Sequence, residues 1–177
     1  MTEYEYELNI RRLHDNDLID AFRMRNDARL WRWFRQPRPL SWAEHVHWFS
    51  SLAGDQQNIM FAITDLDYLK GVCGLTSIDR INQHAEISLY IACKDWRKGI
   101  GSQALGFLFE HAFLRENLNH LWIEAYEGSP AIPFVQTLGM MPCGVRPKFY
   151  FREGKFVDAH LFSITRDQWN ESRFSRD

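Results

Sequence analysis

The chain has few cysteines, no long hydrophobic run and no charge excess, and each absence excludes a class of protein. Cys73, Cys93 and Cys143 are widely spaced and odd in number, so we expect buried reduced thiols rather than a disulfide framework. No pair of Cys or His residues has metal-ligand spacing, and we predict no metal site. No apolar stretch is long enough to span a membrane, and no basic segment leads into an apolar run at the N-terminus. We therefore expect a soluble cytoplasmic protein without membrane contact.

The formal net charge of -2 comes from 21 Lys and Arg residues against 23 Asp and Glu residues. Nucleic-acid binding requires a dominant basic surface, so we expect no nucleic-acid partner. The 177 residues are 45% hydrophobic and 15% aromatic, which is enough apolar material for a substantial core. The composition predicts a single domain over residues 1–177.

Hydrophobic periodicity predicts an α/β (α+β) fold with a mixed central sheet of about seven strands, an antiparallel N-terminal half and flanking helices. The predicted strands are 4–12, 58–64, 68–77, 84–91, 120–126, 141–151 and 155–165. The predicted helices are 18–26, 41–53, 101–116, 129–138 and 166–174. In the second helix we expect Trp42, Val46 and Phe49 to form the buried stripe, with His45 and Trp48 at its edges.

A glycine motif at 94–105 lies between an expected strand and an expected helix. Gly99 and Gly101 follow Arg97 and Lys98, which suits a turn whose backbone N–H groups point to an anion at a helix N-terminus. The motif also fits the dinucleotide fingerprint, with Glu124 about twenty residues on as a ribose-binding acid. An antiparallel meander in front of the motif and two adjacent cations favour a phosphate cradle instead.

The order of elements and the segment 97–105 resemble motif A of the GNAT superfamily of acetyl-CoA-dependent N-acetyltransferases, and the resemblance covers nearly the whole chain. Trp96 stands where the family usually has Gln or Arg. The hairpin around 154–158 resembles the ribosomal-protein-alanine acetyltransferase branch. The segments 25–26 and 41–49 look more like the N-acetyltransferases of nucleotide-linked amino sugars in the pseudaminic acid pathway.

The resemblance implies that acetyl-CoA is the co-substrate, with its pyrophosphate on the glycine motif and its pantetheine along the preceding strand. The cofactor-binding residues that it implies are Leu89, Tyr90, Ile91, Trp96, Arg97, Lys98, Gly99, Ile100, Gly101 and Ser102.

Direct acetyl transfer needs a base for the amine and a proton or other stabilisation for the departing thiolate. The predicted base is Glu86, with His84 as the alternative and Ser88 as a residue that could order a water. Family members usually supply the acid from a Tyr of the later helix, where this chain has Val135, and the usual Asn of that helix is Gly128. Either another hydroxyl, of Ser129, Tyr126 or Tyr150, replaces the acid, or the thiolate leaves unprotonated.

The acceptor is expected between the first two helices and the last hairpin. The substrate-binding candidates are Arg25, Asn26, Trp31, His45, Trp48 and Tyr150. No cysteine has a basic, nucleophile-like setting, so we expect an N-acetyltransferase acting by direct transfer in a ternary complex. The expected acceptor is a nucleotide-linked amino sugar or similar small amine, followed by a protein N-terminus and then by a polyamine. The polyamine comes last because the sequence shows no dense acidic cluster to receive several positive charges. The alternatives are a catalytically degenerate acyl-CoA-binding module and, for assembly, a homodimer.

Overall fold

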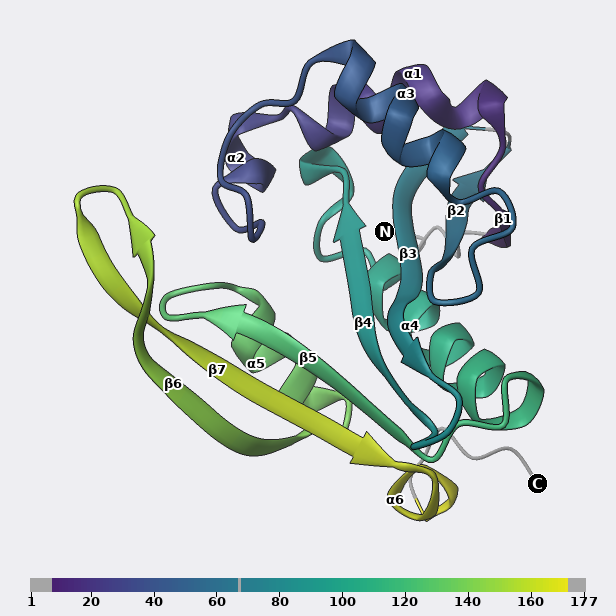
Figure 1. Cartoon of the computed structure of the whole chain (residues 1–177), viewed down its shortest axis with the longest axis vertical. Coiled ribbons are helices and arrows are strands. Elements are labelled where there is room, and N and C mark those ends of the chain that lie inside the picture. The colour runs from purple at the N-terminus through teal and green to yellow at the C-terminus, as the bar shows by residue number, and fades with distance from the viewer. Residues whose placement is uncertain (1–7, 67, 172–177) are drawn as a thin grey trace, which may run out of the picture.

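The computed structural model describes residues 8–66 and 68–171, which fold around one seven-stranded sheet of order β1-β2-β3-β4-β5-β7-β6 (Figure 1). The strands are β1 (Asn9–Arg12), β2 (Ile59–Asp65), β3 (Tyr68–Asp79), β4 (His84–Ile91), β5 (His120–Tyr126), β6 (Met141–Arg152) and β7 (Lys155–Thr165). The β4–β5 pair is parallel and the other neighbours are antiparallel, which confirms the predicted mixed sheet with an antiparallel N-terminal half. Residues 4–7 of the first predicted strand lie outside the described residues.

Helices cover both faces of the sheet. They are η1 (Asp15–Asp17), α1 (Leu18–Arg25), α2 (Ala28–Trp31), α3 (Trp42–Ser51), η2 (Cys93–Asp95), α4 (Ile100–Glu110), the π-helical η3 (His111–Arg115), α5 (Ala131–Thr137) and α6 (Arg166–Asn170). The larger apolar cluster joins α4, η3, α5 and α6 to one face, and a second cluster joins α1 and α2 to the other. Among the described residues, no helix is long and apolar enough to cross a membrane.

The sheet divides between β4 and β5. These strands pair only at His84↔His120, Ala85↔Leu121 and Glu86↔Trp122, and beyond that point they diverge (Figure 1). Each strand keeps its other neighbour, because β4 pairs with β3 as far as Ile91 and β5 pairs with β7 as far as Tyr126. The divergence therefore opens a fork inside an otherwise continuous sheet.

The buried face of α3 differs from the predicted one. The predicted capping box is present, with the Ser41 side chain accepting from the Glu44 N–H, but His45 is the buried residue of this helix and Trp42 is 46% exposed. The ring of His45 lies 5.4 Å from that of Phe22 on α1 and 5.3 Å from that of Trp48. A neutral imidazole can pack among aromatic rings. A buried face predicted only from the most apolar residues of the helix therefore leaves out His45.

Candidate active site

A groove of about 1050 Å³ occupies the fork between β4 and β5. It is lined by the β4 and β5 residues beyond the fork, by the loop between α2 and α3, and by the starts of α4 and α5. The groove contains most of the predicted catalytic and cofactor residues, namely Glu86, Leu89, Tyr90, Ile91, Trp96, Arg97, Gly99, Gly101, Ser102 and Ser129. The fold thus brings residues from separate segments of the sequence into one cavity.

The glycine motif forms the start of α4 at one end of the groove. Gly99 is the N-cap residue with φ +76°, a left-handed conformation that residues with a side chain rarely adopt. At Gly101 a Cβ atom would lie 3.0 Å from Cζ of Phe134, so the absence of a side chain allows α5 to pack against α4. The first N–H groups of an α-helix have no partner within the helix, and they favour an anion. This end of the groove can therefore hold a pyrophosphate.

Three further residues of the motif shape this end of the groove. The indole Nε1 of Trp96 donates to the Ile91 carbonyl over 2.9 Å, which ties the loop back to β4. Lys98 Nζ lies 3.0 Å from Oδ1 of the buried Asp95, and Ile100 is buried in the core. Of the predicted cofactor residues, Lys98 and Ile100 are the two outside the groove lining.

The backbone of β4 offers a second feature that fits a pantetheine chain. The N–H of Ala92 donates to Lys70 on β3, whereas the carbonyl of Ile91 faces the other way and accepts from Trp96. Because backbone groups alternate along a strand, those of Leu89 and Ile87 also face the fork. An extended amide chain lying along β4 would find donors and acceptors there, as in the addition of a strand to a sheet edge.

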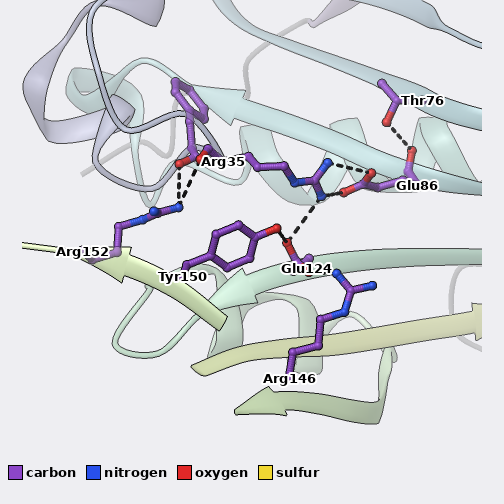
Figure 2. A network of polar contacts seen from close by, with 8 residues as sticks. Arg35, Thr76, Glu86, Glu124, Arg146, Tyr150 and Arg152 are labelled. Atoms are coloured by element: carbon purple, nitrogen blue, oxygen red, sulfur yellow. Dashed lines mark hydrogen bonds and ion pairs between the residues drawn. The ribbon is translucent and has the colours of Figure 1, made fainter. Parts of the chain in front are cut away.

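Two glutamates on adjacent strands lie at the opposite end of the groove (Figure 2). Arg35, from the loop between α2 and α3, donates Nη2 to Glu86 Oε1 over 2.6 Å and lies 3.4 Å from Glu124 Oε1. Glu124 also accepts from Arg146 Nη1 and from the Tyr150 hydroxyl, each over 2.8 Å. Burial opposes the charge of Arg35, but the Glu86 carboxylate outweighs it and raises the pKa of the guanidinium above its usual value.

A bulge in β6 brings Tyr150 to this network. The β6–β7 register shifts between Arg146 and Tyr150, and Lys148 has φ +47° within the bulge. Asp158 of β7 holds the bulge, because its Oδ1 accepts the N–H of Lys148 over 2.7 Å. The bulge re-aims the strand, so that Tyr150 reaches Glu124.

Tyr126 and Arg152 complete the wall on this side. The guanidinium of Arg152 lies 4.5 Å from the ring centroid of Tyr126 and 5.0 Å from that of Tyr150. It also donates to the carbonyl groups of Phe34 and Arg35, which fastens the β6–β7 hairpin to the α2–α3 loop (Figure 2). Burial raises the pKa of Tyr126 to about 12, so its hydroxyl stays protonated at neutral pH and can donate.

The start of α5 carries the two residues that differ from the usual tyrosine and asparagine of the resembled family. Val135 is buried in the core, and Gly128 has φ +80° in the turn before the helix. Ser129 lines the groove, where its Oγ accepts the N–H of Ala131. A hydroxyl that accepts through its oxygen can still donate its proton.

Several predicted residues lie outside the groove lining. His84 stands before the fork, where its Nε2 is 3.8 Å from Asp79 Oδ2, and it lines a separate cavity of about 550 Å³. His45 is 1% exposed and Trp48 packs against it, so both belong to the packing of α3. Trp31 also lies outside the lining, whereas Trp33 is part of it.

Arg25 and Asn26 shape the groove indirectly. Arg25 donates to the carbonyls of Gln36 and Arg38, and the Asn26 side chain both donates to and accepts from the backbone of Leu40. These contacts fix the α2–α3 loop that carries Arg35.

Arg35 and Glu124 are two charged residues of the groove lining that the sequence did not assign to this site. The available signals were a run of arginines between two expected helices and an acidic residue in the strand beside the predicted base. Among the described residues, no group of His, Cys, Asp and Glu side chains could hold a metal ion.

Comparisons with known proteins agree with this architecture. Residues 7–138 match the family model of the acetyltransferase (GNAT) domain. The fold resembles the crystal structure of spermidine N-acetyltransferase from Vibrio cholerae in complex with CoA and spermine, with a TM-score of 0.86, 21% identity, and coverage of 92% of this chain and 98% of that one. A dodecameric structure of spermidine N-acetyltransferase from the same organism gives a TM-score of 0.79 and 21% identity, covering 96% of this chain and 99% of that one. A search of curated proteins gave no match.

Proposed function

The chain belongs to the GNAT acetyltransferase family, and from this premise we propose that it transfers acetyl from acetyl-CoA to a small primary amine held beside Glu86. The favoured acceptor is a nucleotide-linked amino sugar. The transfer is direct, within a ternary complex, and uses no acetylated side chain.

The fork in the sheet is the observation that supports this proposal most strongly. Its two ends are chemically different, with helix N–H groups and glycines at one end and paired carboxylates at the other. The groove passes between β4 and β5, so a cofactor lying along β4 can present its thioester from one side while an amine approaches from the other. A continuous sheet would separate the two reactants.

Acetyl-CoA supplies an activated acyl group whose thiolate is a good leaving group. Glu86 would take the proton of the attacking amine, because its carboxylate lines the groove and only 12% of its side chain is exposed. Val135 has no hydroxyl, so Ser129 or Tyr126, which both line the groove, would donate toward the departing thiolate. Main-chain groups of β4 would orient the cofactor.

Aromatic rings and cations on the acceptor side support a nucleotide-linked sugar. Trp33 and Phe34 line the groove and provide stacking surface, and Arg146 and Arg152 lie beside the groove next to Glu124 and Tyr150. Aromatic faces suit a nucleobase, and guanidinium groups suit a diphosphate. The sugar amine would then reach past these groups to Glu86.

A polyamine is the second candidate. Glu86 and Glu124 are adjacent and largely buried, with side-chain exposures of 12% and 1%. Such a pair can receive an ammonium group, and the fold resembles enzymes named for spermidine. The arginines around both carboxylates favour this acceptor less than the first.

An amine panel tests the proposal. Purified protein is incubated with acetyl-CoA and a nucleotide-linked amino sugar, the free amino sugar, spermidine or a peptide with a free N-terminus, and acetylated products are identified by mass spectrometry. We expect the highest kcat/KM with the nucleotide-linked sugar. A preference for spermidine would replace the first acceptor by the second. Binding of acetyl-CoA without turnover of any amine would indicate a degenerate module and refute the proposal.

A further inference from the structure

Arg35 occupies the position at which an acceptor amine would have to meet Glu86. Its Nη2 lies 2.6 Å from Oε1 of Glu86 and its Nη1 lies 3.4 Å from Oε2, so both carboxylate oxygens face the guanidinium (Figure 2). The same Nη2 lies 3.4 Å from Glu124 Oε1 on the next strand. Arg35 thus bridges the two carboxylates across the fork.

The three side chains differ in burial. Arg35 is 52% exposed, whereas Glu86 and Glu124 are 12% and 1% exposed. Glu124 has further partners in Arg146 and Tyr150, but in residues 8–66 and 68–171 the Glu86 carboxylate has one cationic partner, Arg35. The carboxylates are therefore built into the strands, and the cation approaches from the solvent side.

A guanidinium in this position blocks the chemistry that Glu86 would perform. Arginine stays protonated at any working pH, so it cannot pass a proton to or from the carboxylate. A carboxylate whose two oxygens face a guanidinium has poor access for an amine proton. Glu86 can act as a base only when the Arg35 side chain is elsewhere.

We propose that Arg35 is an internal competitor of the acceptor, filling the cation subsite of Glu86 and Glu124 until a positively charged amine displaces it. This inference rests on the proposed function and deepens it. It makes Arg35 a specificity-determining residue, because an acceptor must present a cation that can replace a guanidinium. A neutral amine or an alcohol would leave Arg35 in place.

The loop allows the side chain to leave without moving the backbone. Arg152 donates to the carbonyls of Phe34 and Arg35, and Arg25 donates to those of Gln36 and Arg38, so the main chain is held on both sides of Arg35. The Arg35 side chain is long and half exposed, so a change of rotamer can carry its guanidinium from the carboxylates toward solvent. Displacement then costs one half-exposed ion pair rather than a loop rearrangement.

Kinetics of Arg35→Gln test the proposal directly. We expect kcat/KM for the acceptor to rise about two- to fivefold, the range expected for an ion pair with one half-exposed partner, with KM for acetyl-CoA unchanged. Arg32→Gln is the matched control, because Arg32 is on the same loop, is similarly exposed and pairs with Glu153 away from Glu86. A tenfold fall in kcat/KM with an unchanged melting temperature would show that Arg35 instead positions Glu86, and would overturn the proposal.

A binding measurement keeps this test separate from the proposed function. Titration calorimetry with methylguanidinium, without acetyl-CoA, should detect binding to Arg35→Ala and none to the wild type or to Arg35→Ala/Glu86→Gln, while tetramethylammonium serves as the cation without donors. If wild-type protein acetylates no amine but Arg35→Ala binds methylguanidinium, the proposed function fails and the cation subsite stands. Equal weak binding to all three proteins would overturn the inference whatever the kinetics show.

Discussion

Replacing Glu86 by Gln distinguishes a catalytic role of this carboxylate from a purely structural role in the ion pair with Arg35. The substitution keeps the shape of the side chain and removes its charge, so the hydrogen bond from Thr76 to the Glu86 backbone is unaffected. If Glu86 is the general base, kcat should fall by about 10²- to 10⁴-fold, the usual contribution of such a group. KM for acetyl-CoA should stay within about threefold, because the cradle lies at the other end of the groove.

The cost in stability should be small by comparison. Arg35 is half exposed, so the lost ion pair contributes about 0.5–1 kcal/mol. With an unfolding entropy of about 2.1 cal/mol/K per residue over 177 residues, 1 kcal/mol corresponds to about 3 °C in Tm. A fall in kcat of a hundredfold or more with a Tm shift within that range would identify a catalytic role that the ion pair alone does not explain.

The assay follows CoA release with a thiol reagent. Cys143 is exposed and would react with the reagent, so the measurements use a Cys143→Ser background. Glu153→Gln is the control, since Glu153 is an exposed glutamate paired with an arginine of the same loop. A change in kcat below threefold for Glu86→Gln, with Tm unchanged, would refute the assignment of Glu86 as the base.

Three further outcomes follow from packing and charge. Gly101→Ala places a Cβ 3.0 Å from Cζ of Phe134, so the ring must shift, and we expect KM for acetyl-CoA to rise about three- to tenfold in steady-state kinetics. Burial lowers the pKa of His45, so the unfolded chain binds this proton more readily; Tm should fall as the pH drops below about 6.5, and His45→Leu should reduce that fall in scanning calorimetry. Arg152→Met removes the two hydrogen bonds from Nη2 to the α2–α3 loop and should raise KM for the acceptor several-fold, with KM for acetyl-CoA unchanged. Unchanged Tm–pH curves for His45→Leu, or equal effects of Arg152→Met on both KM values, would contradict these assignments.

Local patterns predicted the elements well because each rests on local physics. Strand β5 was predicted with its observed limits, 120–126, and the glycine motif was placed at the start of α4. Alternation, helix caps and glycines with positive φ act within a few residues, so a single sequence contains them. The same holds for the turn at Gly154, which has φ +84° between β6 and β7.

The contacts around Glu86 and Glu124, where we propose that the acceptor binds, could not be predicted from local patterns because they join distant segments. Arg35 and Glu86 are 51 residues apart, and Arg35 and Glu124 are 89 apart. Which arginine of an irregular loop reaches a strand depends on how the loop is fixed, here through Arg25 and Asn26. These two residues were predicted as substrate anchors, and in the structure their side chains bond to the backbone of this loop.

The fork explains why the proposed cofactor end of the groove was easier to locate from the sequence than the proposed acceptor end. The cradle and the β4 edge would bind acetyl-CoA through backbone groups, whose placement depends on helix start, strand and glycine positions that the sequence displays. The proposed acceptor end is built from side chains of three segments, β4, β5 and the α2–α3 loop, which meet because β5 leaves β4 after three residue pairs. Backbone recognition tolerates many side chains, whereas the acceptor subsite changes with any one of them. Substitution of side chains such as Arg35 should therefore change the selectivity among amines and leave the binding of acetyl-CoA unchanged.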